Sequence, residues 1–172
     1  MTRATWILLS AALAAGPALA QAPEVKVLST TGKWTAYSFQ ENGKPVCYIA
    51  SQPAKSEGAY SARGDIQLQI SHRPSDNATD VVSVVAGYAY KVDSDAVIQV
   101  GRAKWDLFTV EGRAWARDAK TDKAIINAFI KGNTAVVTGT SSRGTLTTDT
   151  YSLQGFTAAY KKIGEECGVK AG

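Results

Sequence analysis

Short runs in which apolar residues recur at every second position fill most of this chain, and they constrain its fold more than any other feature. Ile66, Leu68 and Ile70 alternate with polar residues, a pattern typical of a strand with one buried face. Further runs rich in β-branched and aromatic residues lie at 34–39, 46–51, 81–90, 96–100, 104–110, 113–116, 134–140 and 145–153. This number of short strands predicts a mainly β single domain, either a β-sandwich or a barrel-like sheet.

Residues that favour turns separate these runs. Asn42-Gly43 predicts a two-residue hairpin, and Glu111-Gly112 and residues 74–79 predict further turns. Residues 21–31 are expected to be a polar lead-in and residues 52–62 a loop. Gly87 interrupts the 81–90 run, which predicts a bulge or a close approach of two backbones.

Two segments follow a helical period instead. Thr121 is expected to cap a short helix with Ala124, Ile125, Ala128 and Phe129 on its apolar face, ending at Gly132. Near the C-terminus, apolar residues recur at intervals of three and four at Phe156, Ala159, Tyr160, Ile163 and Cys167. This spacing predicts a second amphipathic helix whose apolar face packs on the sheet.

The N-terminus has the three parts of a secretory signal peptide. Arg3 precedes an apolar run at residues 6–15, and Ala18-Leu19-Ala20 completes the pattern. We expect residues 1–20 to be removed and residues 21–172 to form the single mature domain. The apolar run is shorter than the roughly 20 residues of a membrane-spanning helix, so no transmembrane segment is expected after cleavage. The expected location is the periplasm, with outer-membrane association or secretion as alternatives.

The charge of the chain does not favour nucleic acid as a partner. The formal net charge is +4, and it falls to +3 once Arg3 is removed with the signal peptide. The arginines are scattered and form no basic block, whereas a nucleic-acid footprint needs clustered cations. The expected partner is an envelope or host-surface protein or a glycan.

Cys47 and Cys167 are the two cysteines of the chain. Export exposes them to an oxidising compartment, so an even pair predicts a disulfide rather than two buried thiols. Cys47 shares a strand face with Ile49, and Cys167 continues the apolar face of the C-terminal helix. Both are expected to point into the core, where the bond would tether that helix.

No motif marks a catalytic, metal or cofactor site. The single histidine, His72, is expected to be exposed at the end of a strand, and no Gly-x-Ser-x-Gly occurs. Residues 93–95 are expected to be a solvated turn, and Arg63-Gly64-Asp65 a chance match to an adhesion tripeptide. Three tryptophans, Trp34, Trp105 and Trp115, are expected in the core or an interface, with sugar platforms as the alternative.

One polar hairpin offers a candidate interaction site. Residues 138–150 are rich in hydroxyl groups, and Arg143 sits at the tip of the turn beside Gly144 and Thr145. Side chains at such tips are exposed, and loops often carry function. Alternating threonines on an exposed sheet face would explain the composition as well.

Several stretches together resemble the invasion-associated locus B family of exported bacterial proteins. They are Trp34-Thr-Ala-Tyr, Cys47-Tyr-Ile, Val82-Ser-Val with Gly87-Tyr88, Ala114-Trp-Ala, residues 139–156, Ala158-Ala-Tyr and Cys167. The resemblance implies a periplasmic or outer-membrane-associated protein without known catalysis. In pathogens the family is tied to host-cell entry, and hence to virulence.

Two functions are consistent with these observations. The first is a non-catalytic envelope protein that acts by protein or surface interaction, and that contributes to host-cell invasion or colonisation in a host-associated species. The alternative is a periplasmic hydrolase or a domain that binds a small ligand or glycan. A pocket with converging carboxylates and tryptophans would favour the alternative.

The signal peptide generates a direct prediction. Mass spectrometry of the native protein should find a chain that begins at Gln21 or its pyroglutamate form, because the Ala18-Leu19-Ala20 pattern directs cleavage after Ala20. Recovery of the full-length chain from the cytoplasm would contradict this expectation.

Overall fold

The computed structural model describes residues 23–170. The predicted signal peptide, residues 1–20, lies outside the described residues. No helix in the described part is both long and apolar enough to cross a membrane.

Within residues 23–170, eleven strands form one antiparallel sheet in the order β1-β2-β3-β5-β6-β9-β8-β7-β10-β11-β4. Their bounds are β1 Lys26–Thr31, β2 Trp34–Glu41, β3 Lys44–Ser51, β4 Lys55–Gly58, β5 Gln67–Arg73, β6 Ala78–Val85, β7 Ala96–Val100, β8 Ala103–Val110, β9 Arg113–Ala116, β10 Thr134–Thr140 and β11 Leu146–Ser152. Two α-helices, α1 Ala119–Lys131 and α2 Phe156–Cys167, and a short 3-10 turn at Pro74–Asp76 complete the described fold. The predicted mainly β domain with two short helices is confirmed.

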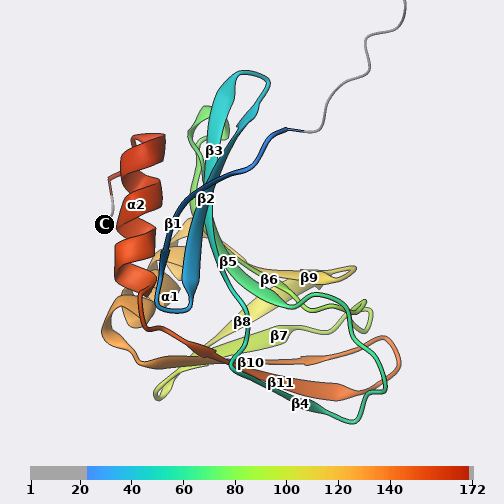
Figure 1. Ribbon diagram of the computed structural model, residues 1–172. Helices are drawn as coiled ribbons and strands as arrows, with labels where there is room; N and C mark the ends of the chain where they lie inside the picture. Colours follow the sequence, from blue (N-terminus) through green and yellow to red (C-terminus); the bar gives the residue numbers. More distant parts are fainter. Residues whose placement is uncertain (1–22, 171–172) are drawn as a thin grey trace, which may run out of the picture.

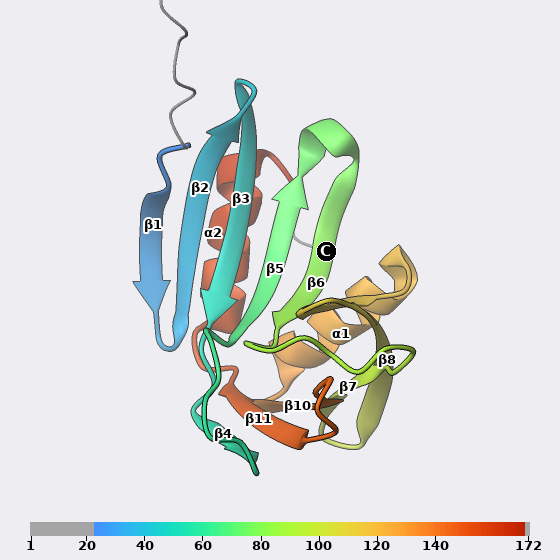
Figure 2. The ribbon, with the colours of Figure 1, turned by 90° about the vertical axis from the view of Figure 1, so that its right-hand side faces the viewer.

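The sheet is sharply bent into two halves (Figure 1). The upright half consists of β1, β2, β3, β5 and β6, and α2 packs on one of its faces. Figure 2 shows this half from its other face, with α2 behind the strands. The remaining strands run across the bottom of the molecule in Figure 1, and α1 packs in the corner, mainly against β6. The bend lets both helices cover one continuous core.

Most strands lie within a residue or two of their predicted positions, but the sequence analysis missed two. The expected polar lead-in contains β1, and the expected 52–62 loop contains β4. Both lie at the edges of the sheet, where each pairs with a single neighbour. Edge strands bury little surface, so β1 and β4 carry no clear apolar alternation. Backbone pairing in the folded molecule makes them strands.

The first residue of α1 also differs from the prediction. Asp118, rather than Thr121, is the N-cap, and its carboxylate accepts a hydrogen bond of 2.7 Å from the Thr121 amide. The predicted end at Gly132 is confirmed, although Gly132 is extended rather than left-handed. Both Asp and Thr are good caps, so composition alone does not choose between them.

The core is aromatic where α2 meets the sheet. Trp34 is fully buried, and its ring contacts Phe156 at a centroid distance of 5.1 Å. Its indole N–H donates to the Ser152 carbonyl at 2.9 Å. Next to it, Gly32 and Gly155 both have positive φ, and their backbones pass so closely that a Cβ at Gly155 would lie 1.9 Å from the Thr31 carbonyl oxygen. The start of α2 is therefore packed directly on the β1–β2 turn.

A disulfide joins Cys47 on β3 to Cys167 at the end of α2, as predicted. The two Cα atoms are 6.1 Å apart, and both side chains are buried. Cys47 shares its buried face with Ile49, so the expected orientation is confirmed. The bond closes a separation of 120 residues and holds the last helical turn on the sheet.

The prediction that His72 is exposed is wrong. Strand β5 extends to Arg73, so His72 falls on the same face as Leu68 and Ile70 and is completely buried. The Asp80 amide donates to Nδ1 at 3.0 Å, so the proton of the neutral ring is on Nε2, which has no partner. Burial lowers the His72 pKa, and the nearby Asp80 carboxylate opposes that effect only partly.

Asp122, in the first turns of α1, takes the place of a missing strand partner for β6. Strand β9 pairs with β6 only at Ser83–Val85, and the Val82 amide beyond it donates to the Asp122 carboxylate at 2.8 Å. Burial raises the Asp122 pKa to about 6, and the negative charges of Asp80 and Asp118 add to the effect. An ionised Asp122 therefore costs stability at neutral pH.

Reducing the disulfide, or replacing both cysteines with serine, should loosen α2 first. The loss should be about 2–5 kcal/mol of unfolding free energy, because the bond closes a long loop and anchors the end of α2. Hydrogen exchange on the oxidised and reduced protein would locate the change in residues 156–167, with α1 as the internal reference. Equal protection of α2 in both forms would refute the tether.

Asp122→Asn should stabilise the protein at about pH 8 and have little effect at about pH 4, since the asparagine keeps the acceptor for Val82 but carries no charge. The folded-state pKa of Asp122 is raised from 3.8 to about 6. The contribution of protonated Asp122 to stability is therefore fully present below pH 3.8 and is lost as pH rises through about 6, where the buried carboxyl group ionises. The penalty removed at about pH 8 is at most about 3 kcal/mol, the free energy that corresponds to the pKa shift from 3.8 to about 6.

Urea unfolding at the two pH values would measure the difference in stability between Asp122→Asn and the unmodified protein. His72 is present in both proteins, so its own titration cancels in that difference. Asp106→Asn, at an exposed position on β8, serves as the matched control and should change stability at neither pH. An equal effect of Asp122→Asn at both pH values would contradict the prediction.

Candidate functional site

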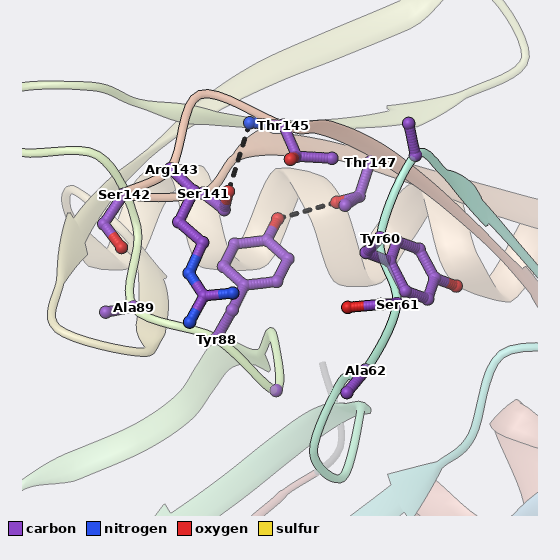
Figure 3. Close-up of a pocket in the computed structure, with 12 residues that line it drawn as sticks. Tyr60, Ser61, Ala62, Tyr88, Ala89, Ser141, Ser142, Arg143, Thr145 and Thr147 are labelled. Carbon is purple, nitrogen blue, oxygen red and sulfur yellow. Dashed lines mark hydrogen bonds between the residues drawn. The ribbon is translucent and has the colours of Figure 1, made fainter.

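A pocket of about 400 Å³ opens beneath the turn between β10 and β11 (Figure 3). Three segments that lie far apart in the sequence form its walls: the loop after β4, the segment after β6, and the β10–β11 turn. Its lining residues are Ala59, Tyr60, Ser61, Ala62, Gly87, Tyr88, Ala89, Ser141, Ser142, Arg143, Thr145 and Thr147. No aspartate, glutamate or tryptophan of the described residues lines the pocket.

Internal hydrogen bonds hold the β10–β11 turn in one shape. The Ser141 amide donates to the Thr145 carbonyl at 2.9 Å, and the Thr145 amide donates to the Ser141 hydroxyl at 3.1 Å. Gly144 has a φ of +84°, which favours glycine. The Ser142 amide donates to the Ala89 carbonyl at 2.7 Å and fixes the turn to the segment after β6. The predicted hairpin is therefore a rigid rim of the pocket.

The structure brings two of the three candidate interaction residues to the pocket. Arg143 is exposed and extends from the turn along the pocket wall, and Thr145 lines the same wall. Gly144 shapes the turn but does not line the pocket. Within residues 23–170, Arg143 has no acidic side chain within ion-pair distance. It is therefore an uncompensated positive charge at the rim.

A buried ion pair that the sequence analysis did not find supports the pocket from behind. Arg63 donates two hydrogen bonds to the Asp149 carboxylate, at 2.8 and 2.6 Å, and both side chains are almost fully buried. The Arg63 Nε also donates to the Ala86 carbonyl at 2.6 Å. Burial alone would lower the Arg63 pKa, but the Asp149 carboxylate outweighs it and the net shift is upward. One signal was present: Asp149 alternates with Thr147 and Tyr151 on the buried face of β11.

Arg63-Gly64-Asp65 is thus a structural element. The Arg63 side chain is 4% exposed, so its guanidinium is not accessible to an adhesion receptor. The Gly64 amide donates to the Gly87 carbonyl at 2.9 Å. A Cβ at Gly87, whose φ is +72°, would lie 2.5 Å from the Gly64 oxygen. The close approach predicted at Gly87 is confirmed, and it joins two walls of the pocket.

The tyrosines of the pocket are held in place by Arg63 and by β10 and β11. The Arg63 guanidinium lies 4.8 Å from the Tyr88 ring centroid and 5.5 Å from that of Tyr60. The Tyr88 and Thr147 hydroxyls share a hydrogen bond of 2.6 Å (Figure 3). Gly139 leaves room for the Tyr88 hydroxyl and for the neighbouring Tyr90 ring, because a Cβ there would lie 3.1 Å from the first and 2.5 Å from the second. Burial raises the pKa of Tyr88, so its hydroxyl stays neutral.

The other residues considered in the sequence lie elsewhere. Trp34 is in the core, and Trp105 and Trp115 are half-buried on β8 and β9, with Trp115 stacked on Phe108 at 5.5 Å. Asp93 lies in a turn that the Ser94 amide closes by donating to the Lys91 carbonyl at 3.2 Å, and Asp95 beyond the turn pairs with Arg117. No group of three or more His, Cys, Asp or Glu residues suited to a metal ion occurs in the described part of the chain.

Comparison with known proteins places the chain in a family. Residues 34–164 match the model of the family described as invasion associated locus B (IalB) protein. A search of curated proteins finds no match. Among solved structures, the crystal structure of invasion associated protein B from Bartonella henselae is similar, with a TM-score of 0.52 and 18% identity, over 83% of this chain and 95% of that one. At this low identity the structural likeness shows a shared fold alone. The family match covers well over half of the 172 residues, and the chain therefore belongs to the invasion-associated locus B family.

Proposed function

We propose that this protein is a non-catalytic exported protein that acts by binding a partner at the pocket beneath the β10–β11 turn. The observation that carries the proposal is Arg143, an exposed cation that has no counter-ion among residues 23–170 and lies on the rim of a pocket whose walls are fixed by internal contacts. A preformed site of this kind avoids the entropic cost of ordering loops on binding.

The cellular setting of the proposal follows from export. The N-terminal signal-peptide pattern predicts export, and the Cys47–Cys167 bond suits an oxidising compartment. We place the mature protein in the periplasm, with the outer membrane or the exterior as the alternatives. The family and the Bartonella henselae protein are both named for invasion. In a host-associated species, the same binding site would contribute to invasion or colonisation.

The pocket favours binding over hydrolysis. Most glycoside hydrolases use two carboxyl groups that flank the scissile bond, and no carboxylate lines this pocket. The nearby Asp149 is held in the ion pair with Arg63. A small-ligand or glycan-binding domain, by contrast, is compatible with the same pocket.

Arg143→Ala should weaken partner binding while the melting temperature barely changes. A charge-assisted hydrogen bond contributes about 1.5–3 kcal/mol, so the Kd should rise by about ten- to a hundredfold. The mature protein would first capture a partner from envelope and host-surface fractions, and the identified partner would then be titrated with each variant.

Arg102→Ala is the matched control, because Arg102 is also an exposed arginine at a hairpin tip, between β7 and β8. It should bind like the unmodified protein. If Arg143→Ala binds equally well, the pocket rim is not the contact site. If Arg143→Ala instead lowers the melting temperature strongly, Arg143 is a structural residue.

A further inference from the structure

The charges around the pocket select for an anionic ligand. Among residues 23–170, Arg143 is the one charged residue in the lining, and Arg63 behind the wall is neutralised by Asp149. A planar guanidinium presents two parallel N–H donors, a geometry that matches a carboxylate or a phosphate, and a single cation balances the one charge of a carboxylate but only part of the charge of a phosphate monoester. The absence of aspartate and glutamate from the lining disfavours a cationic ligand.

The free polar groups of the pocket are hydroxyls. Within residues 23–170, the side-chain hydroxyls of Ser61, Ser142 and Thr145 make no hydrogen bond, whereas those of Ser141 and Thr147 are bonded internally. A hydroxyl both donates and accepts, so three free hydroxyls complement a ligand that itself carries several hydroxyls.

Most backbone amides of the rim already donate hydrogen bonds within the protein. The amides of Ser141, Ser142, Gly144 and Thr145 all donate to groups of the protein itself. A peptide that adds to a sheet edge gains its affinity from free main-chain groups, and this rim offers few. The pocket therefore suits a ligand recognised through side chains.

The remaining lining consists of two tyrosine rings and small side chains. Tyr60 and Tyr88 present aromatic carbon next to Ala59, Ala62 and Ala89. In the part of the chain that the structure describes, no leucine, isoleucine, valine or phenylalanine lines the pocket, so a lipid chain would find little apolar surface. Aromatic rings beside hydroxyls suit the mixed surface of a sugar ring, which has both C–H and O–H groups. The volume of about 400 Å³ lies at the lower end of small-ligand sites.

From these features we infer that the pocket binds a carboxylated sugar. Arg143 binds the carboxylate, the free hydroxyls of Ser61, Ser142 and Thr145 bind the sugar hydroxyls, and the Tyr60 and Tyr88 rings contact the sugar ring. This inference rests on the proposed function and names the chemistry of the partner at the same site.

The test measures binding of the mature protein to glycans that carry one carboxylated sugar, either a hexuronic acid or a nine-carbon acidic sugar, and to neutral glycans matched to them. The acidic glycans should bind about tenfold tighter or more, and the preference should shrink as salt is added. Arg143→Ala should remove the preference, whereas Arg102→Ala should leave it intact. Ser142→Ala, at an exposed hydroxyl without a protein partner, should weaken binding by about two- to tenfold.

Three outcomes would overturn the inference. They are equal binding of the acidic and neutral glycans, a preference that survives Arg143→Ala, and the absence of binding to any acidic glycan. Peptides with a terminal carboxylate form a separate arm. If these peptides bind through Arg143 and the glycans do not, the sugar is wrong while the proposed function stands. If the captured partner binds Arg143→Ala as well as it binds the unmodified protein, the proposed function fails instead.

Discussion

The buried ion pair between Arg63 and Asp149 is the interaction on which the candidate site depends. The chain leaves β3 in the upright half of the sheet, pairs briefly as β4 at the far edge, and returns to β5 beside β3. Arg63 lies in the returning loop and joins it to β11 through Asp149 and to the end of β6 through the Ala86 carbonyl. Loss of one partner would leave an unpaired buried charge, which costs about 3–5 kcal/mol. The Arg63 guanidinium thus connects three segments, and it also contacts the Tyr60 and Tyr88 rings of the pocket.

The bent sheet separates the stabilising core from the binding site. The upright half carries α2, the disulfide and the aromatic cluster around Trp34, whereas the pocket lies in the other half, where β11 passes from the core to the surface. Along the buried face of β11, Tyr151 lies in the core, Asp149 pairs with Arg63, and Thr147 reaches the pocket wall. One strand therefore connects the core to the site, and residues on the rim, such as Arg143 and Ser142, can change without disturbing the packing.

Local patterns predicted the elements that bury a full face. The alternation of Leu68 and Ile70 located β5, and the spacing of Phe156, Tyr160 and Ile163 gave the bounds of α2 as they occur in the structure. The same patterns failed where burial comes from distant segments. His72 ends an apolar alternation and looked exposed, but α2 covers it, and its ring lies 5.8 Å from the Tyr160 ring in a tilted arrangement. The rim of the site was partly predictable because Arg143 follows two serines and precedes a glycine in a polar turn.

The sequence by itself determined the strand-rich composition, the hairpin turns, the two helices and the inward orientation of both cysteines, because each depends on the spacing of residues close together in the chain. Only the tertiary structure decided the bend of the sheet, the edge positions of β1 and β4, and the pairing of Arg63 with Asp149. The Arg63–Asp149 pair joins residues 86 positions apart, and the β4–β11 pairing joins residues farther apart still, such as Lys55 and Thr150, so no local period in the sequence records these contacts. The same reason applies to Arg63-Gly64-Asp65. The tripeptide can be read in the sequence, but its arginine is buried because it pairs with Asp149 on β11, a strand near the C-terminus.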